Sequence, residues 1–161
     1  MKTYTIKEGR HYCEPTLFGL PLHFAFSDSD ITFRFRLNAN CLYDESKIIP
    51  GWNKLYGFSS IGIHSNSVRL SWIVIGGRLV VGYYAYIDGR RFDGDLMIIQ
   101  PNTWYTGFCK ADGLSYIMGV DGVSKVLPGG KKPIIAYRAF PYFGGNSTSP
   151  QTITIDIEKL N

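Results

Sequence analysis

The stretch Gln100–Val123, QPNTWYTGFCKADGLSYIMGVDGV, decides the fold class. It predicts two strands, each followed by a tight turn: 104–110, Asp112-Gly113, 116–120 and Asp121-Gly122. An Asp-Gly pair between apolar or alternating runs is a strong hairpin signal, because a type I′ turn needs a positive φ at both central residues. The stretch therefore indicates consecutive antiparallel strands, with Trp104 expected in the core.

The same pattern recurs along the rest of the chain. Further strands are predicted at 3–6, 22–26, 31–37, 54–63, 67–75, 78–87, 123–127, 134–140 and 152–157. Several alternate between apolar and polar residues, which indicates one face in the core and one in solvent. Asp88-Gly89 and Asp93-Gly94 are predicted to be turns, and 44–47 a short helical turn. About a dozen strands must form two layers, so we expect an all-β, two-sheet antiparallel β-sandwich in a single domain, residues 1–161.

Composition excludes several classes of protein. The net charge of +4 comes from basic residues scattered along the chain, which argues against a nucleic-acid partner. No apolar run approaches the length of a membrane span, and the first ten residues lack the apolar segment of a signal peptide. We therefore expect no membrane span and a protein that is cytoplasmic as synthesised. Three widely spaced cysteines without a C-x-x-C motif predict thiols rather than disulfides or a zinc site.

Three local patterns carry a family resemblance. They are Trp104-Tyr105 with the hairpin that ends in Val120-Asp121-Gly122-Val123, the loop FPYFGGN at 140–146, and the alternating final strand at 152–157. In this order they resemble the concanavalin A-like lectin/glucanase superfamily, in its laminin-G-like or pentraxin-like form. The resemblance implies a jelly roll in which the last strand pairs near the first.

The resemblance also bears on catalysis. Glucanases of the superfamily carry a Glu-x-Asp-x-x-Glu strand, which supplies the two carboxylates that hydrolysis needs. Its polysaccharide lyases carry Arg-Glu-rich, Gln-x-His and Tyr-x-Lys strands. This chain has none of these motifs, and most of its aspartates lie in predicted turns. We therefore expect no catalytic residues and no enzyme. A glycosidase with a divergent carboxylate pair that includes Asp95 is an alternative, in addition to the two hypotheses given below.

Glycan binding needs less: an aromatic surface for a sugar ring and polar side chains for its hydroxyls. In the run 78–87 the solvent-side row contains Gly82, which predicts a dent beside two tyrosines. The candidate glycan-binding residues are Trp52, His64, Arg69, Tyr84, Tyr86 and Arg138. The alternative is that Tyr84 and Tyr86 are buried beneath a loop or a partner subunit.

No resident cofactor is predicted, and calcium is an open possibility. The oxygen ligands that calcium prefers could come from Asp93, Asp95 and Asn146. The three histidines, His11, His23 and His64, are too far apart in the sequence to indicate a metal site.

Two hypotheses for the function follow. The first is a non-catalytic, lectin-like module that binds a glycan or cell-surface polysaccharide. The second is a structural or assembly protein that packs against copies of itself or against partners. The lack of an export signal suggests a phage virion protein as one form of either, because cell lysis would release it.

Overall fold

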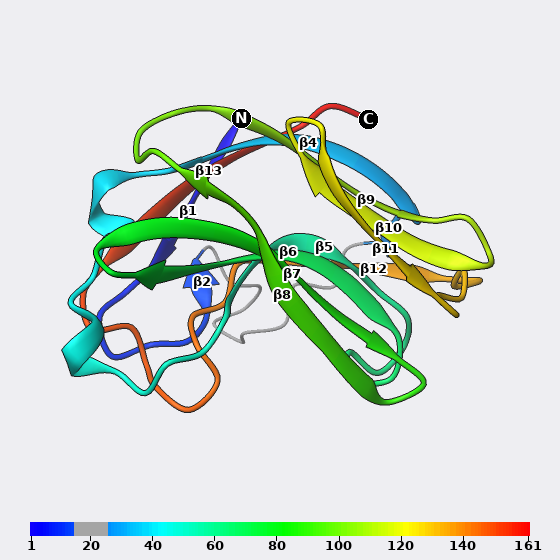
Figure 1. The fold of residues 1–161 in the computed structure, drawn as a ribbon, viewed down its shortest axis with the longest axis horizontal. Coiled ribbons are helices and arrows are strands. Elements are labelled where there is room, and N and C mark those ends of the chain that lie inside the picture. The colour runs from blue at the N-terminus through cyan, green and yellow to red at the C-terminus, as the bar shows by residue number, and fades with distance from the viewer. Residues whose placement is uncertain (15–25) are drawn as a thin grey trace.

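The computed structural model describes residues 1–14 and 26–161 as two antiparallel sheets packed face to face (Figure 1). Sheet A has the order β11 (Val123–Pro128), β10 (Ser115–Val120), β9 (Tyr105–Ala111), β4 (Asp30–Leu37), β13 (Ile153–Lys159), β1 (Lys2–Ile6) and β2 (Cys13–Glu14). Sheet B has the order β3 (Phe26–Ser27), β12 (Ala136–Ala139), β5 (Asn53–Ser59), β6 (Ser67–Ile75), β7 (Arg78–Ile87) and β8 (Arg90–Ile99). Two short 3-10 helices, η1 (Ala39–Cys41) and η2 (Glu45–Lys47), precede β5. The predicted two-sheet, all-β sandwich is confirmed.

Alternation along the strands builds the core between the sheets. On β4, Phe33 and Phe35 are fully buried, while the intervening Arg34 faces outward. On β6, Leu70 and Trp72 are fully buried in the same core. Each buried side chain of this size contributes roughly 1.5–3 kcal/mol through removal of apolar surface from water. The period-two pattern therefore fixes which face of each sheet points inward.

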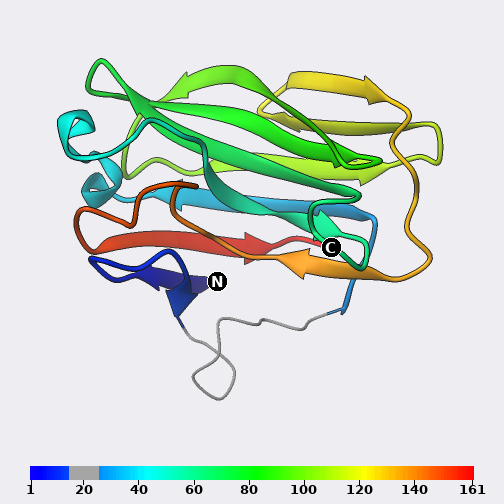
Figure 2. The ribbon, with the colours of Figure 1, turned by 90° about the horizontal axis from the view of Figure 1, so that it is seen from below.

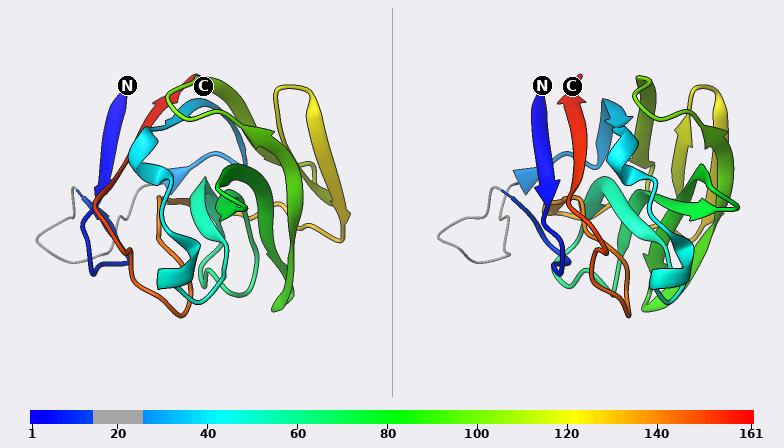
Figure 3. Two further views of the ribbon diagram at one scale, coloured as in Figure 1. Left: turned by 60° about the vertical axis from the view of Figure 1, so that its left-hand side comes forward. Right: turned by 90° about the vertical axis from the view of Figure 1, so that its left-hand side faces the viewer.

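The first and last strands of the chain lie side by side, as the family resemblance implies. β1 pairs with β13 in antiparallel register, with Tyr4 opposite Ile155. Figure 2 shows the two strands next to each other, and Figure 3 shows the two termini at the same end of the sandwich. This pairing adds β1, and β2 beyond it, to the edge of sheet A next to β13.

The turns in the deciding stretch differ from one another. Asp121 and Gly122 have φ values of 43° and 88°, as a type I′ turn between β10 and β11 requires. At the first turn only Gly113 has a positive φ, at 98°, so the predicted type I′ turn is wrong there. Instead, the Asp112 carboxylate accepts hydrogen bonds from the backbone N–H groups of Leu114 and Ser115, both at 2.8 Å. A longer loop stabilised by this side chain joins β9 to β10.

The predicted turn at Asp93-Gly94 is wrong, because β8 runs through both residues without a break. Gly94 pairs directly with Tyr83. A Cβ at Gly94 would lie 2.8 Å from the Tyr83 hydroxyl, so the glycine makes room for this ring rather than for a turn. Of the strand predicted at 22–26, only Phe26 lies within the described residues, and His23 lies outside them.

In the described part of the chain, no helix is long and apolar enough to span a membrane. All three cysteines, Cys13, Cys41 and Cys109, are buried thiols.

Candidate functional site

Cross-strand pairing places a continuous set of polar and aromatic side chains on the outer face of sheet B, turned away from sheet A. Directly paired residues of neighbouring strands lie on the same face. Three successive rows cross the sheet: Lys54, Ser71, Gly82 and Asp95; Gly57, Arg69, Tyr84 and Asp93; and Ser59, Ser67, Tyr86 and Arg91. The middle row contains two of the predicted glycan-binding residues.

Arg69 lies at the centre of this face and is only 5% exposed. Its aliphatic stem crosses Gly57, where a Cβ would come within 2.8 Å of the Arg69 Cγ. The guanidinium lies 5.4 Å from the centre of the Tyr84 ring. Among the described residues, the Arg69 Nε has no hydrogen-bond partner and the guanidinium has no carboxylate in ion-pair range. Burial lowers the pKa of Arg69 to about 10, so the side chain remains charged at neutral pH without a balancing acid.

Lys54 is a second buried cation, 8% exposed, in the neighbouring row. Its Nζ donates hydrogen bonds to the carbonyl oxygens of Trp52 at 2.8 Å and Gly144 at 2.9 Å. It lies 4.6 Å from the Tyr84 ring centre. Burial, and then repulsion by Arg69 and Arg91, lower the pKa of Lys54 to about 8. The amine is therefore mostly charged at pH 7 and loses its proton as the pH rises through about 8.

A pocket of about 380 Å³ opens above these rows. It is lined by Pro50, Gly51, Trp52, Lys54, Ile73, Tyr84, Arg91, Asp93, Gly145 and Asn146. The dent predicted at Gly82 exists, but the indole of Trp52 fills it: a Cβ at Gly82 would lie 2.5 Å from the Trp52 ring. Gly82 thus allows Trp52 to lie against the sheet as one wall of the pocket.

Two loops are tied together around this pocket. The Ile49 N–H donates to the Ser147 hydroxyl at 2.9 Å, and the Gly144 N–H donates to the buried side chain of Asn53. Lys54 and Tyr142 also exchange backbone hydrogen bonds at 2.8 and 2.9 Å. Hydrogen bonds therefore fix the walls of the pocket to the first two residues of β5, Asn53 and Lys54.

Tyr84 lies beneath the pocket and is 7% exposed. Burial raises its pKa to about 12, and the neighbouring Tyr86 acts in the same direction. Arg91 and Asp93 form an ion pair at 2.9 Å beside it. At neutral pH the phenol is therefore protonated and can donate a hydrogen bond or a proton.

The structure brings only some of the predicted residues together. Trp52 and Tyr84 line the pocket, and Arg69 lies in the same row as Tyr84. His64 is exposed and packs edge-to-face against Tyr86 at 5.1 Å, next to the pocket rather than in it. Tyr84 is also buried, as the alternative to a glycan site predicted, although no partner subunit is needed to bury it.

Arg138 is the one candidate on the wrong face. It pairs with Phe58, which is fully buried in the core, so its side chain points toward sheet A. Its guanidinium lies 5.8 Å from the Tyr56 ring. The sequence of the strand predicted at 134–140 lacks the alternation that would have revealed the orientation of Arg138.

Sequence reasoning missed Lys54, Arg91 and Asn146. The register of β5 shifts between Lys54 and Tyr56, so simple alternation does not reveal the outward position of Lys54. Arg91 was placed between two predicted turns, yet it is the second residue of a ten-residue strand, β8. Asn146 was noted only as a calcium ligand.

The proposed calcium ligands do not converge fully. Asp93 and Asn146 line the pocket, but Asp93 is paired with Arg91, and Asp95 lines a separate pocket with Ile98. Within the described residues, no group of three or more His, Cys, Asp or Glu side chains could hold a metal ion. Calcium binding thus remains a prediction.

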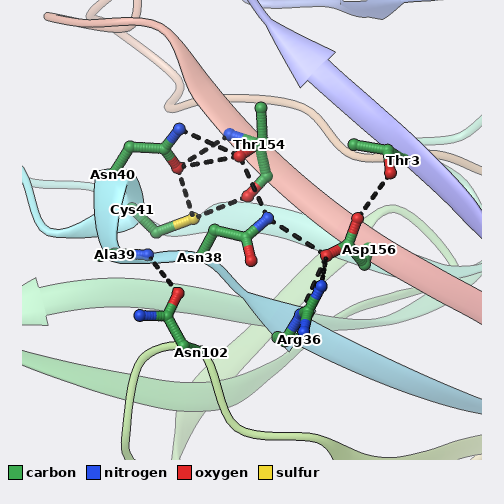
Figure 4. A network of polar contacts seen from close by, with 9 residues as sticks. All are labelled: Thr3, Arg36, Asn38, Ala39, Asn40, Cys41, Asn102, Thr154 and Asp156. Carbon is green, nitrogen blue, oxygen red and sulfur yellow. Dashed lines mark hydrogen bonds and ion pairs between the residues drawn. The ribbon is translucent and has the colours of Figure 1, made fainter.

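The outer face of sheet A carries a contrasting polar cluster, shown in Figure 4. Asp156, 3% exposed, accepts hydrogen bonds from Thr3 at 2.6 Å and from the Arg36 guanidinium at 2.8 and 3.0 Å. Trp104 is partly exposed, with the Arg34 and Arg36 guanidiniums each 5.0 Å from its ring, so its predicted core position is wrong. Here each buried charge has its partner, which indicates a structural role for this cluster.

The two-layer jelly roll is a fold that carbohydrate-active enzymes also have. Alginate lyase AlyC3 matches over 99% of this chain and 75% of its own, with 9% identity and a TM-score of 0.55. The alginate lyase from Klebsiella pneumoniae matches over 82% of this chain and 60% of its own, with 10% identity and a TM-score of 0.51. A glycosyl hydrolase family protein from Mycobacterium fortuitum matches over 83% and 64%, with 14% identity and a TM-score of 0.45. No family model matches the chain, and no curated protein matches its sequence.

The prediction that the chain is not an enzyme is contradicted by these neighbours. That prediction depended on missing strand motifs, yet the two structures with TM-scores of 0.55 and 0.51 are alginate lyases, at 9% and 10% identity respectively. Chains so different in sequence share a fold without sharing local motifs, and a site can be assembled from side chains of several strands. The missing motifs therefore do not exclude catalysis on this fold.

Proposed function

We propose that this protein is carbohydrate-active and binds a polysaccharide across the outer face of sheet B, with one sugar residue in the pocket beside Trp52. The pocket itself is the observation that supports this function. Its volume of about 380 Å³ lies in the range of small-ligand sites, and it combines an aromatic wall with hydrogen-bonding side chains. Trp52 offers a flat apolar surface for a sugar ring, while Asn146 and Arg91 offer donors for its hydroxyl groups.

The test is binding of the whole chain to a panel of neutral and acidic polysaccharides, measured by affinity electrophoresis and calorimetry. Trp52→Ala should weaken binding about tenfold or more, because aromatic anchors carry much of the energy of such sites. Trp104→Ala is the matched control, since it removes a partly exposed tryptophan from the opposite face. Equal loss in both variants, or no binding to any polysaccharide, contradicts the proposal and favours the assembly hypothesis.

Cleavage of the bound polysaccharide is the second candidate function, and Tyr84 favours it. Tyr84 lines the pocket, and its phenol is protonated at neutral pH, so it can act as the general acid that protonates a departing glycosidic oxygen. The test is the appearance of new reducing ends when the protein is incubated with each polysaccharide that it binds. Tyr84→Phe keeps the ring and should retain binding while it abolishes cleavage. Cleavage at the wild-type rate in this variant excludes Tyr84 as the acid.

A further inference from the structure

We propose that the pocket binds the carboxylate or sulfate group of an acidic sugar residue at Lys54, with Arg69 and Arg91 supplying further positive charge. This inference rests on the proposed function and specifies its substrate class. It starts from the excess of positive charge around the pocket. Among the described residues there, the three cations Lys54, Arg69 and Arg91 face one carboxylate in ion-pair range, Asp93, which is bonded to Arg91.

The two buried cations are costly without an anion. A buried charge normally has a carboxylate partner or binds a ligand, because its transfer out of water costs several kcal/mol. Among the described residues, Arg69 and Lys54 have additional support from the rings of Tyr84 and Tyr142, through cation–π contacts at 4.6–5.7 Å. Such contacts offset part of the cost but add no negative charge. An anionic ligand would supply the missing charge.

The hydrogen bonds of Lys54 identify the atom that would contact this anion. An ammonium group has three N–H donors. Two of them are used by the carbonyl oxygens of Trp52 and Gly144, and no acceptor for the third is found among the described residues. Lys54 also lines the pocket, so the third donor is available to a ligand there. Arg69 lies beneath it and acts through its charge rather than through direct contact.

Trp52 explains why the anion would belong to a sugar. The carbonyl oxygen of Trp52 accepts a hydrogen bond from Lys54 and so holds the ammonium group in place. The ring of Trp52 forms one wall of the pocket. A free inorganic anion would contact Lys54 but would leave the face of the indole ring unused. A pyranose ring with an acidic substituent would use both, with its apolar face on the indole and its acidic group at Lys54.

The arrangement predicts that binding depends on pH. Lys54 is faced by Arg69 from β6, by Tyr84 from β7, by Arg91 and Asp93 from β8, and by Tyr142, which contacts His11 and Tyr12 of the N-terminal segment. Burial and the two arginines lower the pKa of Lys54 to about 8, while that of Arg69 stays at about 10. As the pH rises through about 8, Lys54 loses the proton that the anion needs, whereas Arg69 keeps its charge. Affinity for the acidic sugar should therefore fall across this range.

The experiment is calorimetry of the full chain with three oligosaccharides of equal length: a polyuronate, a sulfated oligomer and a neutral oligomer. At about pH 6.5 we expect one or both acidic oligomers to bind at least about tenfold tighter than the neutral one, and to lose most of this advantage at about pH 9.5. The two acidic arms show whether a carboxylate or a sulfate is preferred. Lys54→Met should lose most of the preference already at about pH 6.5, because only the charges of Arg69 and Arg91 remain.

Two further variants keep the test decisive. Lys54→Arg retains a charge at high pH, so any acidic oligomer that it binds should be bound equally well at both pH values. Arg34→Met removes a cation from the outer face of sheet A and should leave binding unchanged. The inference is overturned if the neutral oligomer binds as tightly as the acidic ones, or if Lys54→Met keeps the preference. In the first case the proposed function survives; absence of binding to any oligomer overturns both.

Discussion

Arg69 is a buried cation without a described acidic partner, so it should lower the stability of the protein when no ligand is bound. We expect Arg69→Met to raise the free energy of unfolding by about 1–3 kcal/mol, because the substitution removes an unbalanced buried charge and keeps an unbranched stem across Gly57. Urea denaturation at neutral pH, without any glycan, measures the change. Arg36→Met should lower stability instead, since Arg36 is bonded to the buried Asp156. Any loss of stability in Arg69→Met contradicts the expectation.

Gly82 is required by the close approach of Trp52 to the sheet. A Cβ at this position would overlap the carbonyl oxygen of Gly94 and lie 2.5 Å from the Trp52 ring. We expect Gly82→Ala to reduce the free energy of unfolding by about 1–3 kcal/mol through overpacking, and to displace Trp52 from the pocket wall. Denaturation and the tryptophan emission spectrum report the two effects. Gly145→Ala is the control, because no atom lies within 4 Å of a Cβ there; equal losses in the two variants would show that the close contacts do not matter.

At the scale of elements, the side chain of Asp156 joins β1, β4 and β13. It accepts hydrogen bonds from Thr3 on β1, from Arg36 on β4, and from Asn38 at the end of that strand. Burial acts to raise the pKa of Asp156, but these hydrogen bonds outweigh it and lower the pKa below its ordinary value. A carboxylate with a lowered pKa adds stability above its unfolded pKa of about 4, and this is lost as the pH falls through the folded pKa.

We therefore expect Asp156→Asn to cost about 3 kcal/mol at neutral pH, because the variant leaves Arg36 without its buried partner. The difference between wild type and variant should shrink as the pH falls below about 4, where the wild-type carboxyl also becomes protonated. Urea denaturation at a series of pH values measures both. Glu158→Gln is the control from the same strand face, since its ion pair with Arg34 at 3.5 Å is solvent-exposed. A difference that is constant down to about pH 2 would exclude the assigned role of ionisation.

The strands show what local pattern can predict. The predicted bounds of β6 and β7 agree with the structure to the residue, because the alternation in β6, the apolar and aromatic run of β7 and the Gly-Gly turn between them depend only on neighbours in sequence. Asp93-Gly94 has the sequence of a turn but not its structure, since Gly94 is there to accommodate the Tyr83 ring. A close contact between strands leaves no local signature.

The site depends still more on tertiary contacts. Arg69 and Tyr84 were predicted because they alternate with core residues on regular strands. Lys54 was missed because a register shift in β5 decides its orientation, and Arg138 was misassigned because β12 has only four residues. Among the described residues, no carboxylate lies in ion-pair range of Arg69, and this depends on how β5, β6, β7 and β8 lie side by side. No spacing within one strand could have revealed it.

The whole molecule has two outer faces with different chemistry. On sheet A, several charged side chains are paired: Arg36 with Asp156, Arg34 with Glu158 and Lys110 with Asp30. On sheet B, Lys54 lines the pocket and Arg69 lies beneath it, and neither cation has a described carboxylate in ion-pair range. Paired charges on sheet A stabilise the folded protein, whereas the unpaired buried cations on sheet B lower its stability until a ligand binds. This asymmetry, rather than any motif, distinguishes the face that we propose to bind the glycan.

The molecule as a whole should lose stability in alkaline solution. Burial raises the pKa of Cys13 and Cys109 to about 12, and raises that of Cys41 as well. Unfolded thiols ionise near pH 8.5, so the stability that each buried thiol provides is complete below that pH and is lost as the pH rises toward the folded pKa. Between about pH 7 and pH 10 we expect a loss of roughly 1–2 kcal/mol for each thiol. Lys54 acts in the opposite direction, because its folded pKa of about 8 lies below its ordinary value, but it is one group against three.

Urea denaturation in a reducing buffer at about pH 7 and pH 10 measures the net change. Cys109→Ala should cost stability at both pH values, because it leaves a cavity in the core, yet it should make the loss between them smaller by about one thiol's share. Lys54→Met should make the loss larger, since it removes the opposing contribution. The sign of the two differences separates the thiols from the lysine. Equal pH dependence in all three proteins would mean that ionisation of these buried groups does not determine alkaline stability.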